Sequence, residues 1–433
     1  MESLPDEWLS HLIHMKLNQR LAQMGVHMSQ TVIEHVLGRL KDIGIHDVFG
    51  VPGDFSFAVS DAVVNSPEVN WIGCCNELDA GYAADGYARI RGAGAVSTTY
   101  GVGELSALGA IAGAYAEHLP VFHLVGMPGR PTQERRALVH HTLGDGEFAF
   151  FRKMADPVVC ASAIVTPQNA AYHTERLIAE ALYHRRPVYM AFPADVPDQQ
   201  LLSSAQPLDP PRSDPAALQA ATDAIITALD GAGTACILPG LLAKRAGLQA
   251  QVQSFIDASG LPFATMFGDK TVVDEQQPTY IGMYDGRLMD EDVRAFVESC
   301  DQVVTVGTLM TDLNTGAFTA RLDPAKTIDI GHHHTRVGSR AYPDVEMGDL
   351  LTELTGRIPR RNAKAPARPG SPGSAAGSGS DPITAEALYP RWASFLRPSA
   401  PPSRPPASAW SCSPGKEHTR SPSRRSASSA AAG

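Results

Sequence analysis

The sequence has few of the features that are typical of membrane proteins, secreted proteins and proteins stabilised by a bound metal. Its 433 residues contain six cysteines, and none of them lies at the spacing of a zinc site. No run of about eighteen apolar residues predicts a membrane span, and the N-terminus lacks the basic and apolar segments of a secretory signal. These absences predict reduced core thiols at positions 74, 75, 160, 236, 300 and 412, a cytoplasmic location and no membrane partner.

Positive charge is also in short supply. Lys and Arg number 36 against 46 Asp and Glu, which gives a formal net charge of −10 at pH 7. An acidic balance of this size argues against nucleic acid or an anionic membrane surface as the main partner, and favours a small-molecule substrate. The length allows two or three domains, each with its own core.

Short apolar runs alternate with helical stretches along the chain. In the first part, strands are expected near residues 46–51, 71–75, 95–99, 121–125 and 188–192, and in a second unit near 235–238, 302–306 and 327–330. This alternation predicts an α/β fold of parallel sheets flanked by helices. No dinucleotide fingerprint follows the strands of the second unit, so Gly240 is interpreted as a turn glycine.

One acid stands where ligands collect in such sheets. Glu77 follows the expected strand at 71–75 and opens a helix rich in Ala and Gly, whose small residues allow a ligand to approach closely. Ligands bind at the carboxyl ends of parallel strands, and Asp54 falls at the same edge. The residues alone leave a second interpretation open, in which Glu77 only complements the macrodipole of its helix.

Five motifs occur in one order: "VPGDF", "NELDAGYAADGYAR", "GVGELSA", "AGAYAEHLPV" and "HHTLGDGEF". From about Met28 to about Pro197 they resemble the pyrimidine-binding domain of thiamine-diphosphate 2-oxoacid decarboxylases, the group of pyruvate, indolepyruvate and phenylpyruvate decarboxylases. The pair His140–His141 favours this group over acetolactate synthases and benzoylformate decarboxylases, which stay open as alternatives.

The resemblance implies a cofactor site. Glu77 would hydrogen-bond the pyrimidine ring of thiamine diphosphate and tune its electronics, while Pro52 and Val102 would contact the ring through backbone and apolar surface. The protein's task in such enzymes is to bind and orient the cofactor, which carries the difficult chemistry.

The resemblance also implies a proton relay. Asp54, His140 and His141 occupy the positions of the polar cluster that handles protons while a 2-oxo acid loses CO2 and an aldehyde departs. Histidine suits this role because its pKa lies near neutrality. Without the resemblance, two adjacent histidines are more typical of one exposed and one packing residue.

No residue is assigned as a metal ligand. Gly144-Asp145-Gly146 looks like the start of the family's magnesium motif, but no buried strand precedes it and no suitable Asn follows it, so we reject it. The ligands of Mg²⁺ are expected in a C-terminal diphosphate-binding domain that this sequence does not supply. His332-His333-His334 lacks acid or Cys partners at ligand spacing and is interpreted as a solvated loop.

The domain boundaries follow from these matches and from composition. We expect an N-terminal extension (1–27), the pyrimidine-binding domain (28–200), a central α/β domain (214–357), a linker (358–380), the start of the diphosphate-binding domain (381–398) and a disordered tail (399–433). The tail has no Leu, Ile, Val or Phe. A shift of reading frame near Pro398 is our hypothesis for its composition, and Met28 our hypothesis for the natural start.

The expected activity is non-oxidative decarboxylation of a 2-oxo acid to an aldehyde and CO2, by a homodimer or homotetramer. In this family the cofactor lies between the pyrimidine domain of one subunit and the diphosphate domain of its neighbour. We therefore expect little activity from this polypeptide alone. The alternative is a non-catalytic partner that regulates a full-length relative or donates a half-site to it. Pyruvate, indolepyruvate and phenylpyruvate all remain open as substrates.

Overall fold

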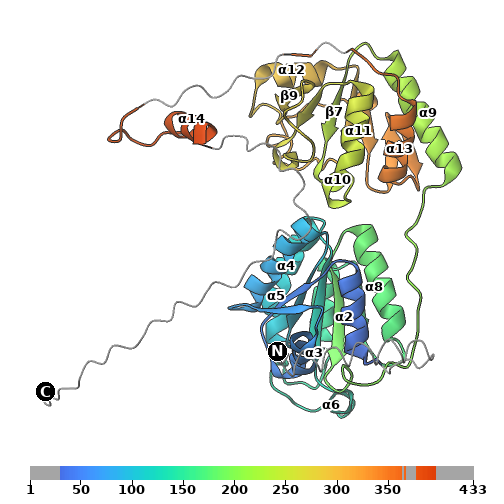
Figure 1. Cartoon of the computed structure of the whole chain (residues 1–433), viewed down its shortest axis with the longest axis vertical. Coiled ribbons are helices and arrows are strands. Elements are labelled where there is room, and N and C mark those ends of the chain that lie inside the picture. Colours follow the sequence, from blue (N-terminus) through green and yellow to red (C-terminus); the bar gives the residue numbers. More distant parts are fainter. Residues whose placement is uncertain (1–29, 363–364, 367–376, 396–433) are drawn as a thin grey trace, which may run out of the picture. The chain divides into compact units, whose positions relative to one another are not determined.

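The computed structural model describes residues 30–362, 365–366 and 377–395. The chain up to residue 368 contains two sheets, each with its own core of buried side chains (Figure 1). We call residues 30–200 the N-terminal lobe and residues 214–362 the central lobe. Among the helices of the described residues, none is long and apolar enough to cross a membrane. The expected extension (1–27) and tail (399–433) lie outside the described residues.

The sheet of the N-terminal lobe has six strands, all parallel, in the order β2-β1-β3-β4-β6-β5. Their bounds are Asp47–Gly50 (β1), Asn70–Gly73 (β2), Gly94–Thr98 (β3), Val121–Met127 (β4), Ala161–Ile164 (β5) and Val188–Pro193 (β6). The chain leaves β1 for β2 on one side and returns to β3 on the other. The topological switch point, where ligands bind in open parallel sheets, therefore lies between β1 and β3.

Helices cover both faces of this sheet (Figure 1). One face carries α2 (Val32–Asp42), α3 (Phe57–Asn65) and α8 (Ala170–His184); the other carries α4 (Glu77–Arg91), α5 (Val102–Ala116) and α7 (Phe150–Ala155), and a short helix α6 spans Arg130–Glu134. Strands β3, β4 and β6 are buried along their whole length, as the double covering requires.

Local capping fixes where the helices of this lobe begin. The Thr31 hydroxyl accepts from the Glu34 N–H and the Glu34 carboxylate accepts from the Thr31 N–H, a reciprocal capping box for α2. At the start of α4 the Asn76 side chain accepts from the Asp79 N–H, and Gly92 ends the helix at φ 93°. These caps place Glu77 in the first turn of α4.

The central lobe holds a seven-stranded sheet in the order β13-β12-β11-β10-β7-β8-β9. Its strands are Ala235–Pro239 (β7), Phe263–Thr265 (β8), Tyr280–Met283 (β9), Gln302–Val306 (β10), Thr327–Ile330 (β11), His334–Val337 (β12) and Arg340–Pro343 (β13). Its helices are Pro215–Gly231 (α9), Leu241–Arg245 (α10), Gln249–Ser259 (α11), Glu291–Ser299 (α12) and Met347–Arg357 (α13).

The expected strands near 235–238, 302–306 and 327–330 are present as β7, β10 and β11. The parallel sheet expected for this lobe is instead mixed, because β12 pairs antiparallel with β11 and with β13. These two strands form an edge hairpin of four residues each, too short to produce a periodic hydrophobic pattern.

Residues 377–395 fall in a separate unit. They contain helix α14 (Ala385–Phe395), with Pro390 inside it. This agrees with a helical segment after the linker, and its assignment to the start of a diphosphate-binding domain stays a prediction.

Candidate functional site

The sequence-predicted residues all follow the carboxyl ends of adjacent strands in the N-terminal lobe. Pro52 and Asp54 come after β1, Glu77 after β2, Val102 after β3, and the histidine pair after β4. Because these four strands are parallel neighbours, their carboxyl ends share one edge of the sheet. The turns after β1 and β3 flank the topological switch point, so the topology places the predicted residues where a ligand would bind.

The structure brings Asp54, His140 and His141 together. Asp54 opens a short 3-10 helix, η1 (Asp54–Ser56), and its Oδ2 lies 2.7 Å from Nε2 of His140. Nδ1 of His141 lies 3.8 Å from Oδ1 of the same carboxylate, an ion-pair distance when the ring is protonated. The two imidazole rings lie 4.6 Å apart, and Phe55 stacks on His140. A carboxylate and two imidazoles this close together can exchange protons with one another and with a ligand.

The conformation of His141 is unusual and is supported by its neighbours. Its φ is +60°, in the left-handed region that non-glycine residues rarely adopt. Its Nδ1 is buried and makes no hydrogen bond within the described residues. Its carbonyl lies against Gly101, where a Cβ would stand only 1.9 Å from the His141 oxygen. A strained residue held by close packing at a polar cluster is a mark of a functional position.

Glu77 lies on another part of the same edge. Its Oε1 is 3.3 Å from where a Cβ on Gly103 would stand, so the carboxylate lies against the first turn of α5. Within the described residues the Glu77 carboxylate has no hydrogen bond or ion pair, and it is half-buried. A half-buried carboxylate without a protein partner can accept a hydrogen bond from a ligand. An acid that only complemented the helix macrodipole would not need such a ligand.

The surroundings of Glu77 fit a flat aromatic ring. Val102 is 57% exposed and Pro52 is exposed, so both offer apolar surface at the switch point. Gly103 leaves the space above the Glu77 carboxylate that a side chain would fill. The exposed apolar surface of Pro52 and Val102 and the carboxylate without a protein partner suit the aminopyrimidine of thiamine diphosphate, so the residues present fit this half of the cofactor.

The polar residues nearby do not form a magnesium site. Among the described residues, the group of three His and acid side chains whose ligand atoms lie within 4.8 Å of one another is Asp54, His140 and His141. Mg²⁺ prefers an octahedral set of oxygen ligands, which two imidazoles do not supply. Asp145, in the rejected Gly-Asp-Gly segment, accepts from the Glu147 N–H within its own loop.

Sequence reasoning missed Glu104 and Tyr189, two buried residues beneath this edge. Glu104 accepts hydrogen bonds from the Gly101 N–H and the Tyr189 hydroxyl, both at 2.8 Å. Burial raises the pKa of Glu104 to about 7. Glu104 stands at the acid position of a capping box, but Gly101 lacks the side chain that completes this signature, so the sequence signal for the acid is weak. Tyr189 lies in a fully buried strand, and no sequence signal indicates its contact.

Two other sequence interpretations need correction. Cys75 is exposed, because β2 ends at Gly73, so it is not a core thiol. The three histidines at 332–334 are only partly a solvated loop: His334 is exposed but opens β12, and the His333 ring is hydrogen-bonded to Glu346 at 2.7 Å. Burial, with smaller contributions from nearby charges, lowers the pKa of His332 to about 3.

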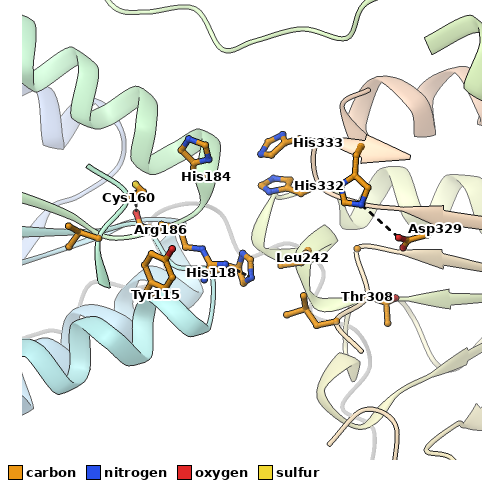
Figure 2. A pocket seen from close by; sticks show the side chains of 15 residues that line it. Tyr115, His118, Cys160, His184, Arg186, Leu242, Thr308, Asp329, His332 and His333 are labelled. Atoms are coloured by element: carbon orange, nitrogen blue, oxygen red, sulfur yellow. Dashed lines mark hydrogen bonds and ion pairs between the residues drawn. The ribbon is translucent and has the colours of Figure 1, made fainter. Parts of the chain in front are cut away.

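A cavity of about 600 Å³ beside these histidines contains none of the predicted site residues (Figure 2). Figure 2 shows the rings of His332 and His333 beside each other, with His118 and His184 among the other lining side chains. The His118 ring contacts the Arg186 guanidinium at 3.0 Å. Burial is the main cause that lowers the pKa of His118, to about 4, so the ring is neutral at physiological pH.

Family models match both lobes. Residues 30–147 match the N-terminal TPP binding domain of thiamine pyrophosphate enzymes, and residues 222–353 match the central domain of the same enzymes. The chain belongs to the thiamine pyrophosphate enzymes. The matched N-terminal range contains Asp54, Glu77, Val102 and both histidines.

Its curated relatives include proteins named alpha-keto-acid decarboxylase. The protein from Mycobacterium leprae is 38% identical over 374 residues, covering 85% of this chain and 65% of the relative. The protein from Mycobacterium bovis is 40% identical over 333 residues, covering 76% of this chain and 59% of the relative. The chain thus spans about two thirds or less of the length of these relatives.

A solved structure shares the fold. The X-ray structure of a candidate thiamin diphosphate-dependent enzyme from Mycobacterium smegmatis aligns with a TM-score of 0.61 at 20% identity, covering 79% of this chain and 65% of that chain. At this identity the likeness shows the fold alone.

Proposed function

We propose that the N-terminal lobe supplies the pyrimidine half of a thiamine diphosphate site that decarboxylates a 2-oxo acid, releasing an aldehyde and CO2. The observation that carries this proposal is the free Glu77 carboxylate against Gly103, on the edge that also holds the cluster of Asp54 and two histidines. The names of the curated relatives support it. Pyruvate, indolepyruvate and phenylpyruvate remain the candidate substrates.

When bound, thiamine diphosphate supplies a carbon nucleophile and an electron sink for the bond that breaks as CO2 leaves. In this proposal the Glu77 carboxyl would hold the pyrimidine ring by a hydrogen bond, and Pro52 and Val102 would offer apolar surface to it. The Asp54 carboxylate orients the His140 imidazole through the 2.7 Å contact, so that a proton at this ring can be delivered to the reacting group.

The apolar surface beside the site supports a homo-oligomer. Leu78 and Tyr82 on α4 and Val102 and Leu105 on α5 are exposed, and the two helices pack against each other. Exposed apolar residues gathered on two adjacent helices are typical of an interface. We infer a homodimer or homotetramer in the cytoplasm, with Mg²⁺ ligands supplied by a diphosphate-binding domain rather than by the residues of this edge.

Subunit complementation tests the proposal. The Mycobacterium leprae relative is made inactive by replacing the acid that matches Glu77 with Gln, and is then co-expressed with this chain. We expect aldehyde and CO2 when thiamine diphosphate, Mg²⁺ and each of the three oxo acids are added, and no product with the E77Q variant of this chain.

Three outcomes of this experiment are decisive. No product with either form, in mixed oligomers shown to have assembled, contradicts the proposal. Product from this chain alone that is lost in E77Q supports the proposal and shows that the expectation of inactivity was wrong. An acetohydroxy acid in place of an aldehyde would move the chain to the acetolactate synthase branch.

A further inference from the structure

Residues 99–103, which form the turn after β3 and the first two residues of α5, touch both halves of the candidate site; we call them the 99–103 turn. A Cβ on Gly101 would stand 1.9 Å from the carbonyl oxygen of His141, so the backbone that carries the histidine pair rests directly on this glycine. A Cβ on Gly103 would stand 3.3 Å from Oε1 of Glu77. The position of this turn therefore bears on where the histidine and the carboxylate lie.

The same turn also supports the segment that carries Asp54. A Cβ on Gly53 would stand 2.4 Å from Cβ of Thr99, which means that the turn after β1 packs onto the turn after β3 without an intervening side chain. Tyr100 links the turn to the segment that follows the histidine pair, because its hydroxyl donates a hydrogen bond to the Phe148 carbonyl at 2.8 Å.

Glu104 is the side chain that holds this turn. Its Oε1 accepts from the Gly101 N–H and its Oε2 accepts from the hydroxyl of Tyr189, each at 2.8 Å. Tyr189 belongs to β6 and is fully buried. Glu104 is 3% exposed, and its two hydrogen bonds join the first turn of α5 to a strand in the core of the lobe.

The close approach of His141 explains why an acid is needed there. Gly101 is the N-cap of α5, with φ +65° and ψ −95°. A Ser, Thr or Asp at this position would normally satisfy the free N–H groups of the helix, but its Cβ would collide with the His141 oxygen. With the N-cap side chain excluded, an acid three residues into the helix can still bond the N–H of the cap.

We propose that Glu104 is a positioning residue, which fixes the turn at 99–103 and thereby sets the placement of the Glu77 carboxylate relative to His141. The identity of the ligand between them rests on the proposed function, whereas the positioning itself does not. Burial of an acid is costly, and its pKa of about 7 reflects that cost. The hydrogen bonds to the turn and to the core offset part of the cost.

The lobe offers a matched control for a purely structural role. Glu175, on α8, is also 3% exposed and is bonded to Arg39 at 2.6 Å, but it lies on the opposite face of the sheet. Its replacement should destabilise the lobe without touching the turn. The pair E104A and E175A therefore separates loss of positioning from general loss of stability.

The experiment is amide hydrogen exchange by mass spectrometry on the intact chain, with peptides that cover 99–103 and 139–147. We expect E104A to exchange about tenfold faster in both peptides, because the hydrogen bonds that Glu104 accepts from the Gly101 N–H and the Tyr189 hydroxyl are lost, and E175A to leave both unchanged. E104Q should restore near-native exchange, since its amide oxygen can still accept from the Gly101 N–H. Faster exchange of these peptides in E175A to the same degree, or no change in E104A, would overturn the proposal.

A spectroscopic readout covers the case in which E104A does not fold. The C2–H resonance of His141, assigned with an H141N variant, should shift in Y189F, which keeps the acid but removes its anchor in β6. An unshifted His141 resonance in folded Y189F would also overturn the proposal. E77Q should leave both readouts unchanged while it weakens cofactor binding, so failure of the proposed function and failure of this inference give different results.

Discussion

The two lobes of this protein use the carboxyl edge of a parallel sheet in opposite ways. In the N-terminal lobe the polar side chains at that edge, Asp54, Glu77 and His140, are half-buried or exposed. In the central lobe the corresponding acid, Asp269 after β8, is fully buried and bonded to the Leu241 N–H and to Asn314. The first edge leaves its polar side chains accessible to a ligand, and the second uses Asp269 to tie its own loops together.

The comparison teaches that strand order alone does not define a site. Both lobes have parallel strands with glycine-bearing turns and, among the described residues, both hold a carboxylate at this edge without a full set of protein partners: Glu77 is half-buried, whereas Asp285 after β9 is buried and its Oδ1 makes no hydrogen bond. The resemblance to a known family and the burial of each group are both needed to tell a site from a structural network. Five tests can break or sharpen the contrast.

The largest expected effect concerns the glycine beneath His141. G101A should destabilise the N-terminal lobe by about 3 kcal/mol or more, because it combines a left-handed backbone with a collision at 1.9 Å. G44A, also at positive φ but with no atom within 4 Å, should cost only about 1 kcal/mol. Urea unfolding measures both. Equal costs would show that the close contact at His141 is not present in solution.

The second test is the pH dependence of stability. Burial raises the pKa of Glu104 from 4.5 to about 7, so the folded state holds this proton more tightly than the unfolded chain does. Stability from this source is full below pH 4.5 and is lost as the pH rises to 7, by about 3 kcal/mol in all. E104Q should lack this slope in urea unfolding between pH 4.5 and 7.5.

The stability of the central lobe should also fall as the pH rises, over a lower pH range. Burial raises the pKa of Asp269 from 3.8 to about 6, and D269N should remove that part of the dependence. If neither variant differs from wild type in its pH profile, the two carboxyls are hydrated in solution.

The third test compares one variant at the carboxyl edge of each sheet. N314A removes hydrogen bonds to Asp269, to the Leu309 carbonyl and to the Gly268 N–H, and should cost about 2 kcal/mol of stability. D54N removes an exposed pair and should cost less than about 1 kcal/mol, yet lower decarboxylation in complemented oligomers by about a hundredfold. Aldehyde assays and unfolding curves, run on both variants, would contradict the account if the effects were reversed.

The smallest expected effect is a difference in solvent accessibility between two cysteines, with no change in the stability of the protein. Cys75 is exposed beside Glu77, whereas Cys236 in β7 is fully buried and its burial raises the pKa of the thiol well above the usual range. Iodoacetamide should therefore label Cys75 about a hundredfold faster than Cys236 in the native protein. Peptide mass spectrometry measures the ratio, and C75S should have native stability.

Much of the fold follows from the sequence because strong local signals agree with the tertiary structure. The Thr31–Glu34 capping box and the apolar runs at β3, β4 and β6 each have one consistent interpretation. The β12–β13 hairpin was missed because four-residue strands at a sheet edge carry almost no periodicity.

The candidate site likewise contains residues that the sequence predicts and residues that it does not. The motifs point to Glu77, Asp54 and the histidine pair, since their residue types and order match a known chemistry. The contribution of Tyr189 could not be predicted, because its hydrogen bond joins residues 85 positions apart and depends on how two strands and a helix pack. The placement of His333 against Tyr183 likewise arises from contacts distant in sequence.

Cofactor binding at Glu77 tests the central claim most directly. Trp71, in β2, is the sole tryptophan of residues 30–362 and lies six residues before Glu77, so its fluorescence can report binding at this edge. The account predicts that thiamine diphosphate with Mg²⁺ changes the Trp71 signal, that W71F removes the change, and that E77Q weakens binding by at least tenfold. Equal affinity of wild type and E77Q would contradict it.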